Sequence, residues 1–188
     1  RAYAADGGRL TGICGGYQML GTEIRDPHGV EGAPGMTEGL RLLDATTIIG
    51  RNKVLARVHG IRETDGEEVE GYEIHMGRTR RCTGTDHAFR ITVRQGRGVD
   101  VCDGAASPNG LIWGTYIHGL FDRPGFRTAV LQELDPAYTQ QDSDPASDFK
   151  QRQYALLADH FRSHLNMERL MEIVLAGNAP MFQPETVS

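Results

Sequence analysis

The stretch GICGGYQMLG at residues 12–21 places a cysteine between glycines, where an apolar, strand-like run gives way to a helical one. A buried structural cysteine packs like any small apolar residue and needs no glycine beside it. Glycines are required where the backbone turns sharply, adopts positive φ or approaches another group closely. A nucleophile elbow needs all three, because its reactive residue sits on a strained turn between a strand and a helix. The pattern therefore favours an α/β fold with Cys14 on such a turn.

This position would suit Cys14 for nucleophilic chemistry. The positive end of the helix dipole and the unpaired N–H groups of the first turn both favour a thiolate. The same groups can stabilise an oxyanion after attack on a carbonyl, and the N–H of Gly15 is the first donor we expect. A general base is also needed. His118 is the candidate, since it ends an expected strand, GTYIH, and is followed by glycine.

Two plainer interpretations of these residues exist. Cys14 could be a core cysteine in a glycine-rich turn, but the GxCxG context disfavours that interpretation. His118 could be a structural histidine with a satisfied hydrogen bond. That would be the favoured interpretation of the histidine alone, and it is the weaker one beside a cysteine on an elbow.

Composition and charge exclude several classes of protein. The chain has 188 residues, of which 39% are hydrophobic and 24% charged, as in ordinary globular proteins. A net charge of −5 argues against a nucleic-acid partner, and no apolar run approaches the roughly 20 residues of a membrane span. The cysteines Cys14, Cys82 and Cys102 lack CxxC spacing, so they predict neither a disulfide framework nor a metal site. We interpret Cys82 and Cys102 as packing residues and expect a reducing, cytoplasmic location.

Short apolar runs separated by turn formers predict mixed α and β structure. A glycine- and proline-rich loop is expected at 26–39, and a polar hinge at 137–148. We divide the chain into a core, 1–138, and a C-terminal helical extension of the same domain, 139–188. The expected strands are 9–14, 40–50, 53–61, 69–79, 89–96, 99–106 and 110–118. Helices are expected at 16–24, from Pro124 and from 149. A last helix should be capped by Asn166, with Glu168 in its first turn.

The motif Gly12-x-Cys14-x-Gly16-x-Gln18 resembles the nucleophile motif of the triad (class I) glutamine amidotransferases. Three further stretches, at 37–47, 69–79 and 110–127, resemble the glutaminase domains of the cobyric acid synthase subfamily. The resemblance runs from about Gly12 to Leu175. It implies a flavodoxin-like fold, with a central mixed sheet flanked by helices and a C-terminal helical segment.

The same resemblance implies a truncated start. Only eleven residues precede Gly12 and the first is not methionine, so we expect the first strands of the fold to be missing. A loop that would supply the second oxyanion N–H is expected to be missing with them.

The resemblance also implies a reaction, the hydrolysis of glutamine to glutamate and ammonia. A partner synthetase domain would use ATP and magnesium to amidate a corrinoid, adenosylcobyrinic acid a,c-diamide, with that ammonia. No GxxxxGK[ST] motif occurs in the chain, so we expect no cofactor here and assign ATP and magnesium to the absent synthetase domain. By the family pattern Gln18 contacts the substrate glutamine, and Gly16 keeps the turn tight and lets the substrate approach.

One departure from the family pattern concerns the histidine. Most triad amidotransferases carry His-x-Glu, whereas this chain has HGL at 118–120. Glu73, Asp122, a backbone carbonyl or a carboxylate of the partner could orient His118 instead. His75, with Glu73 and Arg78 nearby in sequence, could bind glutamine, face the corrinoid, dock the synthetase or simply hold a loop.

Other functions remain open on the sequence. The glutaminase of cobyrinate a,c-diamide synthase or of lipid II amidation would share the elbow. A cysteine peptidase of the same flavodoxin-like family would carry the elbow cysteine and a histidine without needing Gln18. A non-catalytic fragment that only binds a partner is the remaining alternative.

Overall fold

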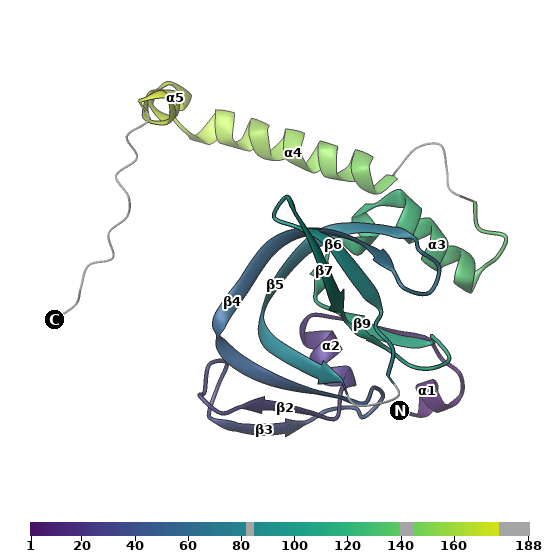
Figure 1. The fold of residues 1–188 in the computed structure, drawn as a ribbon. Coiled ribbons are helices and arrows are strands. Elements are labelled where there is room, and N and C mark those ends of the chain that lie inside the picture. The colour runs from purple at the N-terminus through teal and green to yellow at the C-terminus, as the bar shows by residue number, and fades with distance from the viewer. Residues whose placement is uncertain (82–84, 140–144, 177–188) are drawn as a thin grey trace. The chain divides into compact units, whose positions relative to one another are not determined.

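The computed structural model of the protein describes residues 1–81, 85–139 and 145–176 (Figure 1). The chain divides into two compact units, residues 1–140 and 141–188. Cys82 lies outside the described residues. In chain order the first unit contains α1 (Ala2–Ala5), β1 (Leu10–Ile13), α2 (Gly15–Leu20), β2 (Glu23–Asp26), β3 (Gly35–Glu38), β4 (Ala45–Arg62), β5 (Glu68–Arg81), β6 (Phe89–Arg94), β7 (Arg97–Asp103), β8 (Ala105–Ala106), β9 (Ile112–Thr115), β10 (Ile117–His118), the 3-10 helix η1 (Leu120–Asp122) and α3 (Pro124–Leu134).

The strands of the first unit form two sheets. The smaller sheet has the order β1-β9-β8, with β1 parallel and β8 antiparallel to β9. The larger sheet has the order β10-β5-β4-β2-β3, and β6 and β7 extend it from β4. Its strands are antiparallel except for the parallel pair β2 and β4. The expected α/β class, with helices against mixed sheets, is confirmed.

Long curved strands dominate the larger sheet (Figure 1). β4 and β5 pair along nearly their whole length, with an irregularity in register between Ile49 and Val54. The strands expected at 40–50 and 53–61 are therefore one continuous strand. The expectation of two was wrong because the polar residues at 51–53 lie on a bulged strand and not in a turn.

The helix expected at 16–24 is shorter, and the loop expected at 26–39 is partly ordered as strand. α2 ends at Leu20, since Gly21 takes an extended conformation with ψ of −173°. Glu23–Asp26 then pairs with both β3 and β4. Gly35–Glu38 forms β3, which the glycine-rich sequence around it did not predict.

The strand expected at 110–118 divides between the two sheets. Ile112–Thr115 pairs with β1, whereas Ile117–His118 pairs with β5. Tyr116 alone separates the two strands. This crossing brings the ends of the two sheets together, close to where Cys14 follows β1.

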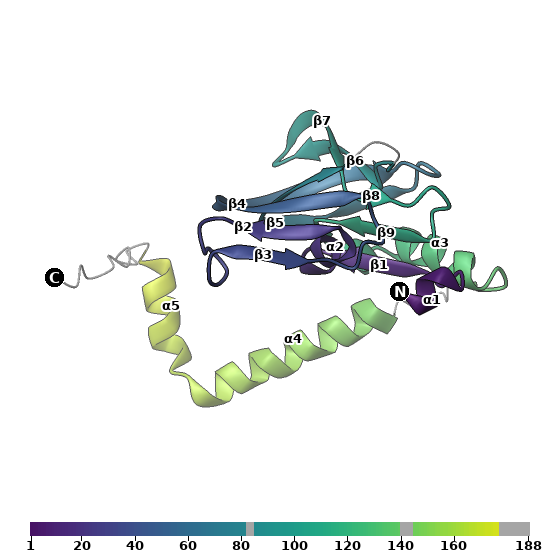
Figure 2. The same ribbon diagram turned by 90° about the horizontal axis from the view of Figure 1, so that it is seen from below.

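Two hydrophobic clusters hold the first unit together. One lies around α2 and includes Tyr17, Leu20 and Ile112, and Figure 2 shows α2 beside the parallel pair β1–β9. The other joins both sheets to α3. There Phe126 meets the rings of Phe89 in the larger sheet, Trp113 in the smaller sheet and Phe121 in η1. The start of α3 at Pro124 is confirmed.

The second unit contains α4 (Pro145–His164) and α5 (Met167–Leu175). The side chain of Asn166 accepts a hydrogen bond of 2.9 Å from the backbone N–H of Arg169. Glu168 lies in the first turn of α5, so the predicted cap is confirmed. The expectation that 139–188 extends the same domain stays a prediction.

Candidate active site

Cys14 occupies the strained turn between β1 and α2. Its φ of 54° and ψ of −113° lie in a region that residues with a side chain rarely adopt. Its N–H donates to the carbonyl of Thr115 at 2.9 Å, and its own carbonyl accepts from the N–H of Gln18 at 3.1 Å. The residue is thus held from the neighbouring strand and from the helix, which is the geometry of a nucleophile elbow.

The glycines around Cys14 differ in the space beside them. A Cβ on Gly12 would lie 2.7 Å from the backbone of Gly16 and from Leu20, so only glycine lets α2 pack this closely on β1. A Cβ on Gly15 or Gly16 would meet no protein atom within 4 Å. The backbone of the first turn of α2 is therefore open at these two glycines, next to Cys14.

The structure brings Cys14 and His118 to the same stretch of β5. The half-buried thiol of Cys14 donates to the carbonyl of Ile74 at 3.5 Å, and His118 pairs with Tyr72. Tyr72 and Ile74 are roughly 7 Å apart along the strand, at about 3.3 Å per residue. Among the described residues no hydrogen bond joins the two side chains, so their contact, directly or through one water, stays a prediction.

The imidazole of His118 stacks on Tyr72, with 5.2 Å between ring centroids and 10° between planes. Its Nε2 is buried and has no hydrogen-bond partner in the described part of the chain. A buried nitrogen without a partner is unusual, and it leaves that atom available for proton transfer. Stacking on Tyr72 restrains the plane of this ring.

Neither carboxylate considered as an orienter contacts His118 among the residues described. Glu73 is buried and instead pairs with Arg94, whose Nε lies 2.9 Å from Oε2. It also lies 3.7 Å from the Nε2 of His75. Asp122 lies in η1, just beyond His118 in the chain. A backbone carbonyl and a carboxylate of a partner, the other two groups that could orient the imidazole of His118, stay predictions.

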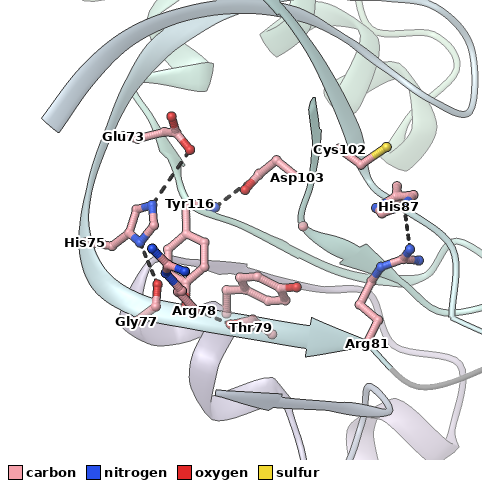
Figure 3. Close-up of a pocket in the computed structure, with 12 residues that line it drawn as sticks. Glu73, His75, Gly77, Arg78, Thr79, Arg81, His87, Cys102, Asp103 and Tyr116 are labelled. Carbon is pink, nitrogen blue, oxygen red and sulfur yellow. Dashed lines mark hydrogen bonds and ion pairs between the residues drawn. The ribbon is translucent and has the colours of Figure 1, made fainter. Parts of the chain in front are cut away.

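Glu73, His75 and Arg78, the further site candidates, line one cavity of about 220 Å³ together with Tyr116 and Asp103 (Figure 3). His75 is fixed within it: its Nδ1 lies 2.8 Å from the carbonyl of Gly77, and its ring stacks on Tyr116 at 3.9 Å. These contacts favour the structural interpretation of His75. Arg78 is exposed.

Gln18 is buried, with 7% of its surface exposed, so the alternative of a solvated helix residue is wrong. Its amide donates to the hydroxyl of Tyr116 at 3.3 Å. That hydroxyl also hydrogen-bonds to Thr79, which in turn bonds to Thr47, each at 2.7 Å. Burial raises the pKa of Tyr116, so the phenol stays neutral. This chain of hydrogen bonds anchors α2 to β5 and β4, and a contact between Gln18 and substrate stays a prediction.

Asp103 is a residue that the sequence analysis missed. It ends β7, and its Oδ2 accepts hydrogen bonds from the hydroxyl of Thr115 and, at 3.3 Å, from the N–H of Tyr116. Burial raises the pKa of this carboxyl to about 6, and the nearby charge of Glu73 acts in the same direction. The local signal was only an acidic residue followed by glycine, Asp103–Gly104, inside the strand expected at 99–106.

In the described ranges no group of three or more His, Cys, Asp or Glu side chains is arranged to hold a metal ion. No helix within those same ranges is long and apolar enough to cross a membrane.

A family model for the CobB/CobQ-like glutamine amidotransferase domain matches residues 1–126. The chain belongs to this family. Its membership confirms the amidotransferase class that the motif at 12–18 predicted.

The curated relatives of this family member are longer proteins. A cobyric acid synthase of Chlorobium phaeobacteroides is 44% identical over 174 residues, which cover 93% of this chain and 34% of that protein. One of Pelodictyon phaeoclathratiforme is 43% identical over 174 residues, again 93% of this chain and 34% of that protein. The chain therefore spans about a third of the length of the curated relatives it matches.

A solved structure described as PurLQS from Thermotoga maritima is also similar to this chain. It matches with a TM-score of 0.48 and 19% identity, over 71% of this chain and 66% of that one.

Proposed function

We propose that this amidotransferase domain hydrolyses glutamine and supplies the ammonia for ATP-dependent amidation of adenosylcobyrinic acid a,c-diamide to adenosylcobyric acid. The observation that carries the proposal is Cys14 at positive φ on the β1–α2 turn of a chain that belongs to this family. The names of the relatives at 43–44% identity support the corrinoid as acceptor over the lipid II and a,c-diamide alternatives.

In the proposed reaction the thiolate of Cys14 attacks the side-chain carbonyl carbon of glutamine. A C–S bond forms, and the N–H of Gly15 stabilises the oxyanion. Protonated His118 gives its proton to the departing amine as the C–N bond breaks, which releases ammonia. Water then attacks the thioester with His118 as base. Glutamate leaves and the thiol is restored.

The rest of the proposed activity lies outside this chain. We assign ATP and magnesium to a synthetase domain in the two thirds of the relatives that the chain does not match. The corrinoid would be amidated there, with ammonia passing between the two parts. We place the whole protein in the cytoplasm, where its thiols would stay reduced.

The test uses Cys14→Ala in the full-length protein, with amidation of the corrinoid measured with glutamine or ammonium salts as nitrogen source. We expect glutamine-supported amidation to be lost and ammonium-supported amidation to persist, because the ATP-dependent step does not need the thiol. His118→Ala should behave alike.

Cys102→Ala is the matched control and should keep both activities. Cys102 is an exposed free cysteine, so its interpretation as a packing residue was wrong. Glutamine-supported amidation by Cys14→Ala would contradict the proposal. A folded Cys14→Ala protein that ammonium fails to rescue would show that Cys14 does more than release ammonia.

A further inference from the structure

The segment Thr115–Ile117 links the two groups on which glutamine hydrolysis would depend. At its first residue, the carbonyl of Thr115 accepts a hydrogen bond of 2.9 Å from the N–H of Cys14. Its other end leads directly into His118, which pairs with β5 in the other sheet. Cys14 therefore follows a strand of one sheet and His118 lies in the other, so the conformation of this crossing determines how far apart they lie.

One carboxyl group holds the crossing. Asp103 accepts from the hydroxyl of Thr115 and from the N–H of Tyr116. The same Thr115 hydroxyl oxygen accepts from the N–H of Ile117 at 3.0 Å. Thr115 is fully buried and Asp103 is 8% exposed, so water has little access to replace these bonds. Two consecutive backbone N–H groups of the crossing thus depend on one carboxyl–hydroxyl pair.

The carboxyl is itself rigidly placed. Gly104, which follows it, has a φ of +71°, and a Cβ there would lie 2.2 Å from the carbonyl oxygen of Gly114. This approach presses the end of β7 against β9. The position of Asp103 next to the crossing is therefore set by the packing of the backbone and not by a flexible loop.

The surroundings of Asp103 are those of a buried acid among other titratable groups. Glu73 and His75 face it from β5 and Tyr116 from the crossing (Figure 3). Tyr17 of α2 lines the same cavity and interacts with the charge of Asp103. Arg81, further along β5, lines the same cavity. Burying an ionisable group is unfavourable compared with burying a neutral one of the same shape. Stability of the fold alone therefore does not call for a carboxyl group here.

We propose that Asp103 and Thr115 are positioning residues for the Cys14–His118 pair. Their carboxyl–hydroxyl contact fixes the crossing between β9 and β10, and with it the separation of the nucleophile from its general base. This inference rests on the proposed function. Neither side chain needs to touch the substrate, so both act through the residues that they hold.

The test compares Thr115→Val with Thr115→Ser in the full-length protein. Valine has nearly the same shape but neither donates nor accepts, whereas serine keeps the hydroxyl. A misplacement of about 1 Å in an active site can lower the rate about 100-fold. We therefore expect Thr115→Val to lower kcat for glutamine hydrolysis by about tenfold or more, with KM changed less than about twofold. Thr115→Ser should keep most of the activity, and ammonium-supported amidation should be unchanged in both.

A second readout does not depend on glutamine. The pH dependence of Cys14 alkylation by iodoacetamide reports whether the thiol is paired with His118, because only the thiolate reacts. We expect Thr115→Val to resemble His118→Ala in this profile and Thr115→Ser to resemble the wild type. If Thr115→Val does not fold, Asp103→Asn tests the positioning role by the same two measurements. A neutral amide oxygen accepts the hydrogen bonds from Thr115 and Tyr116 more weakly than a carboxylate does.

The possible results separate the two proposals. A wild-type protein that releases no glutamate from glutamine would refute the proposed function, while the alkylation profiles would still test the positioning. An active wild type with a Thr115→Val variant of unchanged kcat and unchanged profile would overturn the positioning role. Equal impairment in Thr115→Ser and Thr115→Val would overturn it too, because packing and not the hydroxyl would then be responsible.

Discussion

Replacing Gly12 by alanine tests the packing that creates the elbow. The new methyl group would lie 2.7 Å from the backbone carbon and oxygen of Gly16 and 2.7 Å from Leu20. The leucine can rotate away, but the backbone of α2 cannot move without shifting Cys14. Overpacking of this kind destabilises a protein by about 1–3 kcal/mol. At about 2–4 °C per kcal/mol for a domain of this size, the melting temperature should fall measurably.

The assay combines thermal unfolding with hydrogen–deuterium exchange of peptides that cover β1 and α2, where the loss of protection should be concentrated. Gly16→Ala is the matched control, because its methyl group would enter open space in a helix. Alanine there should be neutral or stabilise α2 by up to about 1 kcal/mol, while crowding the space beside Cys14. A Gly12→Ala protein as stable as the wild type, with unchanged exchange, would refute the close approach of α2 to β1.

Three further predictions follow from the site. A glutamine-derived chloroketone should label the full-length protein at Cys14, and labelling of another cysteine of this chain, seen by peptide mass mapping, would contradict the assignment. Tyr116→Phe should lower the free energy of unfolding by about 1–3 kcal/mol in urea titrations, because the buried amide of Gln18 loses its acceptor. The pKa of Asp103 is raised by burial from 3.8 to about 6. Between these two pH values the carboxyl group therefore stays protonated in the native state, whereas it is ionised in the unfolded state. Its contribution to the free energy of unfolding should therefore fall as pH rises from about 4 to 6 and then level off, and titrations at several pH values should show that this fall is absent in Asp103→Asn.

Local features of the fold could be predicted from the sequence. The elbow at Cys14, the start of α3 at Pro124 and the cap at Asn166 each depend on residues a few positions apart. Glycine, proline and asparagine restrict the backbone or supply a hydrogen bond at the same place in the chain. Their effect does not require knowing what lies across the sheet.

Pairing across the fold could not be predicted in the same way. The apolar run at 110–118 has the composition of one strand, and nothing in it shows that Thr115 belongs to one sheet and Ile117 to the other. Likewise, β3 forms in a glycine-rich segment because β2 offers it an unpaired edge. Strand propensity depends on such neighbours more than on the segment itself.

The residues of the site can likewise be divided into those that their sequence neighbours reveal and those that depend on distant contacts. Cys14 and His118 could be singled out from their own surroundings in the sequence. Asp103 could not, because its role depends on hydrogen bonds to residues 12 and 13 positions away. His75 has a suggestive sequence context, yet its Nδ1 and its ring are already engaged by Gly77 and Tyr116.

The crossing at Tyr116 also makes this part of the chain intolerant of changes in length. Side chains alternate between the two faces of a strand, so one inserted residue before Ile117 would turn His118 to the opposite face of β10. One deleted residue would do the same, and it would also leave no linker between strands that belong to different sheets. The hairpin between β6 and β7, where Gln95 and Gly96 both adopt positive φ, joins two paired strands of one sheet. An added residue at its tip can enlarge the turn without changing the register of either strand. An inserted residue should therefore be accepted at that hairpin and rejected between β9 and β10, although both connections are short.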